Sequence, residues 1–403
     1  MAVKTIAVVG AGIGGLAFGA FAARAGRRVV VFDQFKSPAP VGSGLVIQPV
    51  GQAVLADLGA GAAALALGNP VRRMLGHEAR SGRKTLDVSY DLTGTDRFGL
   101  AIHRAALFQV LLDTARAAGV DLRSDHRVLG RNGQRLEFAH GTDGPFDLIV
   151  DAAGAGSVLS PLKARGLGYG AIWGTVPWPK TDLSQDHLSQ WYRRADHMIG
   201  ALPIGQIPGE PRSMAAIFWS LPVSGYDKWR TTPVQDWKAQ ARSLWPAFAP
   251  FLDTITMHDQ MTMARYSHGT LRRPAADGIA HIGDAAHRAS PQLGQGANMA
   301  LLDAQALWGA LQQNHHLPDA LACYVKARRW HVALYQAMSW AFTPMYQSHS
   351  TVLPALRDHV LAPLSQVPPL ARILSKLVCG DLIPTDGSLR GLGQLRTVQT
   401  GEP

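Results

Sequence analysis

The chain has 403 residues, 47% of them hydrophobic, which allows two domains and excludes a disordered protein. The net charge is +10, but Lys and Arg never form a run longer than two. With no nucleic-acid-binding motif present, this scatter argues against a nucleic-acid partner and favours anionic cofactors and substrates. Two cysteines are too few for a disulfide framework and indicate a cytoplasmic protein. We expect no signal peptide and no stable membrane insertion, because no uncharged run has the length of a membrane span.

The amino-terminal segment reads as strand, glycine turn, helix and strand. Val3–Val9 predicts a buried strand, a helix extends to about Arg24, and Arg28–Phe32 predicts a second strand that ends at Asp33. The turn carries G-x-G-x-x-G with an acid roughly 20 residues further on, the pattern that binds a dinucleotide. The candidate binding residues here are Gly10, Ala11, Gly12, Ile13, Gly14, Gly15, Asp33 and Gln34.

Strand pairs and one helix follow. Val71–Tyr90 predicts a hairpin, Arg104 begins a helix through Arg116, and strands at Asp121–Val128 and Arg135–Phe138 flank an Asn-Gly turn. An arginine in the first turn of a helix is unfavourable for the helix dipole. A bound anion would offset this cost, so for Arg104 we favour a ligand contact over a surface salt bridge.

In the middle of the chain, the predicted elements become mainly short strands. Phe146–Gly156 predicts a buried strand that runs into a glycine loop. Between residues 166 and 268, short β-like runs alternate with Pro and Gly, and Val234–Leu244 predicts a helix. Five aromatic residues could line a cavity, although core packing is the favoured role of each: Trp173, Trp191, Tyr192, Phe218 and Trp219.

A second motif begins at Ile279–Gly283, which predicts a short buried strand. Asp284 stands at its end, and a loop carrying Ser290-Pro291 and Gly294-Gln295-Gly296 leads to a helix from Asn298. The free N–H groups at a helix amino terminus favour an anion or an electron-rich ring edge. The glycines also leave room for a flat ligand.

The remainder predicts helices. One spans Pro318–Ser339, and later pieces are broken by Pro344, Pro354, Pro363 and Pro368-Pro369. For the amphipathic stretch Leu370–Val378 we favour packing or a dimer contact over membrane attachment. No histidine spacing resembles a metal site, so no metal is expected.

The run G-D-A-A-H-x-x-x-P-x-x-G-Q-G-x-N-x-x-x-x-D, from Gly283 to Asp303, carries a resemblance. Together with G-x-G-x-x-G, it resembles the FAD-dependent aromatic hydroxylases, the p-hydroxybenzoate hydroxylase-like group of flavoprotein monooxygenases. The resemblance implies that Asp284 binds the ribitol chain of FAD and that the loop from Pro291 passes beside the flavin ring. It also places Arg104 near the pyrophosphate and the backbone of Val128 near adenine. The candidates implied are Ser43, Arg104, Val128, Asp284, Pro291, Gly294, Gly296, Ala297 and Asn298.

One segment departs from the family pattern. Where the family has G-A-D-G-x-x-S, this chain has Asp151–Ser157, so that Ala153 replaces the usual acid. The arginine that normally follows aligns with Ser160. Because this motif is linked to both FAD and NAD(P)H, the departure bears on the reductant. We expect Asp151 to replace part of the missing acid's role by anchoring the loop Gly154–Ser157.

The implied fold is α/β: a Rossmann-like FAD-binding domain, an inserted β-sheet substrate domain and a helical C-terminal region. The FAD-binding domain is expected at residues 1–70, 97–165 and 270–330, and the substrate domain at 71–96 and 166–269. The C-terminal region is expected at 331–403.

The implied function is hydroxylation of a small aromatic substrate by NADH or NADPH and O2 through a flavin hydroperoxide, in a monomer or homodimer. Since the cofactor carries the chemistry, no catalytic residue is assigned. His197, Tyr192, Tyr266 and His268 are candidates for a substrate base. One alternative is a flavin-dependent halogenase, but Trp173–Trp178 lacks the W-x-W-x-I-P of that class. Another is a non-catalytic flavin-binding protein.

Overall fold

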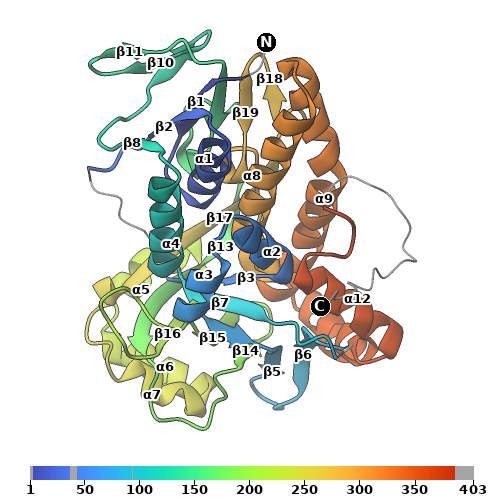
Figure 1. Ribbon diagram of the computed structural model, residues 1–403. Helices are drawn as coiled ribbons and strands as arrows, with labels where there is room; N and C mark the ends of the chain where they lie inside the picture. Colours follow the sequence, from blue (N-terminus) through green and yellow to red (C-terminus); the bar gives the residue numbers. More distant parts are fainter. Residues whose placement is uncertain (1–2, 37–42, 93, 386–403) are drawn as a thin grey trace, which may run out of the picture.

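Two large sheets and a set of C-terminal helices form the molecule. The computed structural model describes residues 3–36, 43–92 and 94–385 (Figure 1). The α/β fold class predicted from the sequence is confirmed. Residues 37–42, which immediately precede the candidate residue Ser43, lie outside the described residues.

The first sheet has six strands in the order β18-β19-β12-β1-β2-β8. Their bounds are β1 (Thr5–Val9), β2 (Arg28–Phe32), β8 (Asp121–Arg123), β12 (Leu148–Asp151), β18 (Ala275–Ala276) and β19 (Ile279–His281). All pairs are parallel except β18–β19. The chain fills one side of β1 with β2 and β8 and then the other side with β12 and β19. The strand order therefore reverses between β1 and β12, where a ligand crevice is expected.

Helices cover one face of this sheet and a small sheet covers the other. The helices α1 (Ile13–Arg24), α4 (Arg104–Ala117) and α8 (Gly296–Gln313) share a buried core with β1 and β2. On the opposite face, Phe32 and Val128 pack with the sheet β9 (Gly130–Asn132), β10 (Arg135–Phe138) and β11 (Gly141–Asp143). The strand predicted over Asp121–Val128 is only partly right, because β8 ends at Arg123.

The second sheet has eight strands in the order β20-β17-β13-β16-β15-β14-β5-β6. Their bounds are β5 (Arg73–Glu78), β6 (Lys84–Ser89), β13 (Arg165–Pro177), β14 (His187–Arg193), β15 (His197–Pro203), β16 (Met214–Pro222), β17 (Met261–Thr270) and β20 (His287–Arg288). The predicted hairpin β5–β6 joins it through β14. On one face lie α5 (Tyr226–Thr231), α6 (Val234–Leu244) and α7 (Ala249–Leu252). The helix α6 has the predicted bounds.

A small sheet and two helices lie between the two large sheets (Figure 1). The sheet has the order β3 (Gly44–Ile47), β7 (Gly99–His103) and β4 (Asn69–Val71). The helices are α2 (Pro49–Asp57) and α3 (Gly61–Leu67). Val46 and Ala101 of the small sheet pack against the face of the eight-stranded sheet that α5–α7 leave free.

The C-terminal part is helical. It consists of α9 (Leu317–Tyr346), α10 (Val352–Leu356), the π-helical turn η7 (Arg357–Leu361), α11 (Ala362–Ser365) and α12 (Pro368–Cys379). The prediction of a break at Pro344 is wrong, because α9 continues through it. Pro344 lies in the last turn, where its missing N–H costs a single helical hydrogen bond. The helix α9 also runs across the boundary expected after residue 330.

Candidate functional site

The sequence motifs meet at the carboxyl ends of the parallel strands. Gly10 follows β1, Asp33 follows β2, and Asp284 lies just after β19. The register places Val9 opposite both Phe32 and Asp151, so the loops after three neighbouring strands start at the same level. A dinucleotide laid across this edge would span the point at which the strand order reverses.

The glycines of the first loop fall into two groups. Gly10 has φ of +101°, and a Cβ there would lie 2.6 Å from Ala152 O. At Gly15 a Cβ would overlap Gly10 O, and at Gly14 it would lie 3.2 Å from Ala300 O. Packing therefore requires glycine at positions 10 and 15 and leaves little room for a side chain at position 14. Gly12 is different, since its nearest neighbour would be 4.0 Å away, which leaves room for a phosphate group at the amino terminus of α1.

Asp33 holds the glycine loop in place. Its Oδ2 accepts the N–H of Ala11 at 2.8 Å, and its Oδ1 accepts the N–H of Phe35 at 2.9 Å. A carboxylate has lone pairs for further donors, so ribose hydroxyls can bind it as well. Gln34 is exposed beside it, and Ile13 is the first residue of α1.

Asp151 anchors the loop that departs from the family pattern. It is fully buried, its Oδ1 accepts the N–H of Ala153 at 3.2 Å, and its Oδ2 accepts the hydroxyl of Ser157 at 2.7 Å. The same oxygen lies 2.7 Å from Nδ1 of His281 on β19. Ser160, which stands in place of the family's arginine, donates its hydroxyl to Ala285 O at 2.6 Å. Asp151 and Ser160 therefore tie this loop to β19 and to the turn of Asp284.

Asp284 itself is exposed, in the 3-10 turn η5 (Gly283–Ala285), and Asp303 on α8 fixes that turn. Asp303 Oδ2 accepts the N–H of Gly283 at 2.9 Å and contacts His287 Nε2 at 2.6 Å, and Oδ1 accepts Nε–H of Arg328 at 2.7 Å. Burial alone would raise the pKa of Asp303, but the charges of His287 and Arg328 outweigh it and hold that pKa well below its usual range.

Sequence reasoning did not give Asp303 a role, although it closes the motif. Arg328 had no local signal at all, because it lies on α9 and meets Asp303 only in the folded chain.

The glycine loop after Asp284 combines exposed and buried groups. Pro291 and Gly296 are exposed, Ala297 is half-buried, and Gly294 ends a 3-10 turn with φ of +60°. A Cβ on Gly296 would meet no atom within 4 Å, so the protein's own packing does not require glycine there. The helix α8 begins at Gly296, two residues before the predicted start.

Asn298 is buried and joins this loop to the small sheet. Its Oδ1 accepts the N–H of Gln48 at 2.8 Å, and its Nδ2 donates to Val46 O at 3.2 Å and Gly294 O at 2.9 Å. The side chain is therefore used to position β3 and the loop.

Ser43 and Arg104 lie next to each other. The N–H of Arg104 donates to Ser43 O at 3.0 Å, and Ser43 Oγ lies 3.2 Å from Gly174 O and 3.1 Å from Thr175 Oγ1 on β13. His103 caps α4 by accepting the N–H of Ala105, and burial, followed by the charge of Arg104, lowers the pKa of His103. The Arg104 side chain is exposed and has no ion pair within the described ranges. Val128, by contrast, is buried beside Phe32.

The structure separates the five aromatic candidates onto two faces of the eight-stranded sheet, because neighbouring strand residues alternate. Trp191 and Trp219 pack beneath α5–α7, which confirms core packing for these two residues. Tyr192, Phe218 and Trp173 lie on the other face, toward the small sheet. Trp173 Nε1 donates to the hydroxyl of Tyr266 at 2.9 Å, next to the strand residues that Ser43 contacts.

The candidate bases differ in chemistry. Burial raises the pKa of Tyr266 to about 12 and that of Tyr192 well above 10, so both phenols stay neutral near pH 7. Burial lowers the pKa of His268, which keeps that imidazole uncharged near pH 7. His268 Nε2 lies 3.4 Å from Ser339 Oγ, which in turn contacts Ser290 of the glycine loop. His197 instead lies against Arg193 and Asp196.

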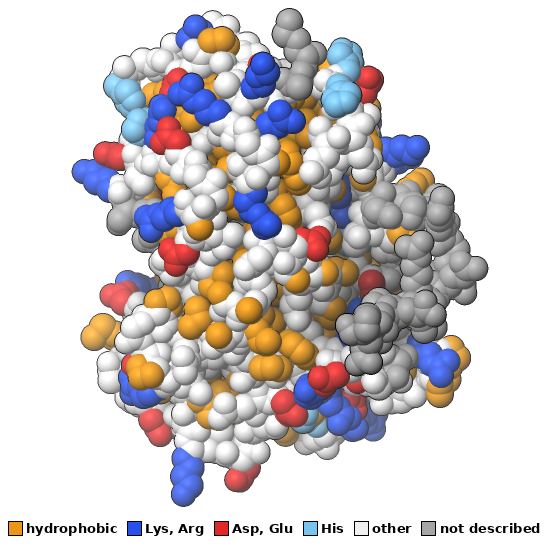
Figure 2. Space-filling model, in the orientation of Figure 1, with side chains coloured by type: hydrophobic (Ala, Val, Ile, Leu, Met, Phe, Trp, Pro, Cys, Tyr) orange, Lys and Arg blue, Asp and Glu red, His pale blue; other side chains and the backbone are white. Residues whose placement is uncertain are grey.

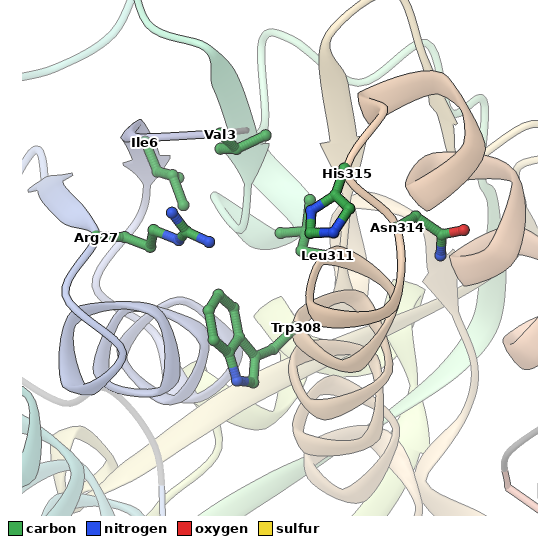
Figure 3. Close-up of a pocket in the computed structure, with 7 residues that line it drawn as sticks. All are labelled: Val3, Ile6, Arg27, Trp308, Leu311, Asn314 and His315. Atoms are coloured by element: carbon green, nitrogen blue, oxygen red, sulfur yellow. The ribbon is translucent and has the colours of Figure 1, made fainter. Parts of the chain in front are cut away.

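Two hollows lie away from these motifs. A cavity of about 20 Å³ lies between β1 and the end of α8, where Arg27, Trp308 and His315 point toward one another (Figure 3). It has room for a water molecule and not for a flavin. An open hollow of about 470 Å³ lies between α9 and the start of β18. Within the described ranges, no group of three His, Cys, Asp or Glu side chains could hold a metal, and no helix is long and apolar enough to cross a membrane.

Comparison with known proteins identifies the family. Residues 3–335 match the FAD binding domain family. The FAD-dependent urate hydroxylase of Klebsiella pneumoniae is 26% identical over 340 residues, which cover 80% of this chain and 85% of the relative. The 3-amino-4-hydroxybenzoate 2-monooxygenase of Streptomyces cremeus is 28% identical over 342 residues, covering 78% and 80%.

Solved structures share the fold. Klebsiella pneumoniae HpxO in complex with FAD and uric acid superposes with a TM-score of 0.79 at 20% identity, over 93% of this chain and 97% of that chain. The chain belongs to the FAD binding domain family and, within it, to the FAD-dependent aromatic hydroxylases, which are flavoprotein monooxygenases.

Proposed function

We propose that this protein holds FAD across the carboxyl edge of the six-stranded sheet and uses NADH or NADPH and O2 to hydroxylate a small aromatic substrate. One observation carries the proposal: the protein's packing does not require glycine at Gly12 or at Gly296. Gly12 lies on the loop that Asp33 holds, and Gly296 lies on the loop that follows Asp284. Open space at a glycine, beside a free helix amino terminus, fits close approach by a ligand.

The proposed contacts follow the length of the cofactor. Gly10–Gly15 and Arg104 would hold the pyrophosphate, and Asp33 with Gln34 would bind the adenosine ribose. The backbone near Val128 would flank adenine, and Asp284 would accept the ribitol hydroxyls. Ser43 and the loop from Pro291 to Asn298 would surround the ring system. When bound, FAD supplies the redox and oxygen chemistry. The protein's own residues orient it and exclude water.

The substrate is proposed to lie between the glycine loop and the free face of the eight-stranded sheet. Trp173 and Tyr266 offer aromatic surface there. His268 is the candidate base with a side-chain path to the glycine loop, through Ser339. An uncharged imidazole near pH 7 can accept a phenol proton. The relatives named for urate and for 3-amino-4-hydroxybenzoate support a ring substrate with acidic hydroxyl or N–H groups.

An oxygen-uptake screen tests the function. Purified protein should contain FAD and consume NADH or NADPH and O2 when a suitable phenol, quinolone or purine is added, with a hydroxylated product by mass spectrometry. A product formed only with added halide would identify a halogenase instead. Bound FAD without uptake for any ring compound would favour a non-catalytic flavin-binding protein.

A further inference from the structure

The C-terminal helices expose a row of large apolar side chains. Fifteen large hydrophobic residues of the described chain are exposed, and seven of them fall between residues 352 and 373. They are 39% to 72% exposed and form what we call the C-terminal stripe: Val352, Leu356, Val360, Leu364, Val367, Leu370 and Ile373. The other eight are distributed along the rest of the chain. An exposed apolar surface of this extent marks an interaction site.

The stripe is held in place by its inner side. The first four members recur at every fourth residue of α10, η7 and α11, so they share one helical face. Beside this face, Arg357 is buried: its Nη1 donates to Met345 O at 2.9 Å, and its guanidinium lies 4.9 Å from the ring of Tyr192. Arg357 also pairs with Asp358 at 2.6 Å. The helices are therefore anchored through polar groups on the inside, and the apolar residues point outward.

The charges around the stripe have one sign. Residues 360–371 contain no charged residue. Asp358 is the one acid between residues 352 and 380, and it is buried and paired with Arg357. Arg372 and Lys376 on α12 are exposed, and Arg83 of the β5–β6 hairpin contacts His359 Nδ1 at 2.6 Å. Across the part of the chain that the structure describes, these three basic side chains have no carboxylate partner.

We propose that the C-terminal stripe docks reversibly on an anionic membrane surface. Apolar side chains on the outside of surface helices, rimmed by Lys and Arg, are the combination that lies in the headgroup region of a bilayer. This differs from the expectation for Leu370–Val378, which favoured packing or a dimer contact over membrane attachment. A second copy of the chain fits less well, because a two-fold interface places each basic rim against its own copy. Figure 1 shows these helices beside β6 on one side of the molecule, and α11 and α12 contact that strand.

The helix α12, which carries Leu370 and Ile373 of the stripe, also contacts the glycine loop. The inner face of α12 accepts a hydrogen bond from Gln295 Nε2 at Val378 O, 3.0 Å away, and one from Tyr335 at Leu377 O, 2.9 Å away. Contact with a membrane would thus bring the lipid surface to the elements that support the glycine loop. This part rests on the proposed function, whereas docking itself does not.

Vesicle flotation of the full-length protein tests the proposal. Vesicles of phosphatidylcholine with phosphatidylglycerol should carry the protein, pure phosphatidylcholine should carry much less, and added salt should weaken binding. The variant L364Q/V367Q/L370Q should lose at least about tenfold in partition, and R372Q and K376Q about fivefold each. A matched control, L129Q/M257Q, replaces exposed apolar residues elsewhere and should bind as the parent does.

Other outcomes overturn the proposal. Failure of the parent protein to float with anionic vesicles would exclude docking. A dimer in sedimentation velocity that L364Q/V367Q/L370Q converts to monomer would assign the stripe to a second copy. Flotation only after residues 386–403 are removed would show that this segment occupies the stripe. FAD content and thermal midpoint should match the parent in every variant, and a loss of either would reveal a folding defect.

Discussion

At the scale of single residues, the two carboxylates of the second motif have different roles. Asp284 is exposed and free to meet a ligand, whereas Asp303 is buried and supports the turn that presents Asp284. The difference follows from their partners, since a buried carboxylate stays charged only when cations and N–H groups surround it. Their substitutions should therefore have separable effects.

Replacing Asp284 by Ala should weaken FAD retention while leaving the apoprotein as stable as the parent. The variant would lose the proposed charged acceptor of the ribitol hydroxyls, which should weaken FAD binding by on the order of 1–3 kcal/mol. Fluorescence titration of apoprotein with FAD measures the change, and Asp277→Ala, an exposed acid elsewhere, is the control. Parent-like affinity in Asp284→Ala would remove this residue from the site.

Replacing Asp303 by Asn should lower the free energy of unfolding by about 3–5 kcal/mol, because it leaves the buried Arg328 without its counter-charge. The measurement is urea unfolding of the apoprotein. Asp253→Asn, which breaks the exposed pair with Arg242, should cost less than about 1 kcal/mol. Equal effects of the two substitutions would contradict the structural role of Asp303.

At the scale of elements, the start of α8 and the packing of α9 on α12 support the glycine loop. Ser290 contacts Ser339 and Thr343 of α9, and Gln295 bonds to the end of α12. A loop held at several points on two helices is preorganised, so little ordering cost remains when a ligand binds.

Gly296→Val should abolish FAD binding without unfolding the protein, because the new side chain enters the space proposed for the ring and not a packed core. Gly309→Val is a matched control on the same helix, where a Cβ also meets no atom within 4 Å. Both variants place a β-branched side chain in a helix and should lose a similar amount of helix stability. FAD content and circular dichroism separate binding from folding, and equal FAD content in the two variants would refute the geometry.

The contact between α9 and α12 should depend on pH through His331. Its Nε2 lies 2.9 Å from Gly380 O, and burial, then the charge of Arg328, lowers the pKa of His331 to about 4. The unfolded chain binds the proton more readily, so stability is full above about pH 6.5 and falls as the pH drops toward 4. The loss should be on the order of 3 kcal/mol.

Unfolding midpoints measured across that pH range test the assignment. His331→Gln keeps a donor for Gly380 O but does not titrate, so its stability should vary less with pH than that of the parent. A parallel pH dependence in parent and variant would place the titrating group elsewhere.

At the scale of the whole molecule, the parts of the site come from segments far apart in sequence. Figure 2 shows Lys and Arg spread over the visible face, with hydrophobic side chains gathered over α3 and β7. On this face, the basic side chains do not gather into one continuous patch.

Reduction by NADH or NADPH should be slow, with a high KM, unless substrate is bound. Ser160 uses its hydroxyl to hold Ala285 O, so it supplies no charge for the phosphates of the reductant. Stopped-flow reduction with and without substrate measures this, and FAD affinity should remain ordinary. Asp151→Ala, which frees Ser157, should slow reduction further. Rapid reduction of the parent at micromolar NAD(P)H without substrate would contradict the prediction.

The sequence by itself determined the local elements and the family. The strand β2, the helix α6 and the β5–β6 hairpin follow from periodicity and turn residues, which act within a few positions of the chain. The two flavin motifs are likewise contiguous, so their residue types and spacing could be recognised without the fold. The continuation of α9 through Pro344 could not be predicted, because packing along a long helix outweighs one missing hydrogen bond.

Tertiary structure alone decided which residues meet. It paired Asp303 with Arg328, bound Asp151 to His281 on a neighbouring strand, and assigned Trp191 to the core and Trp173 to the opposite face. Among the residues that the structure describes, it also left the C-terminal stripe exposed. The physical reason is that such contacts join positions tens to hundreds of residues apart. Their geometry depends on how whole elements pack, and no local pattern of residues encodes that packing.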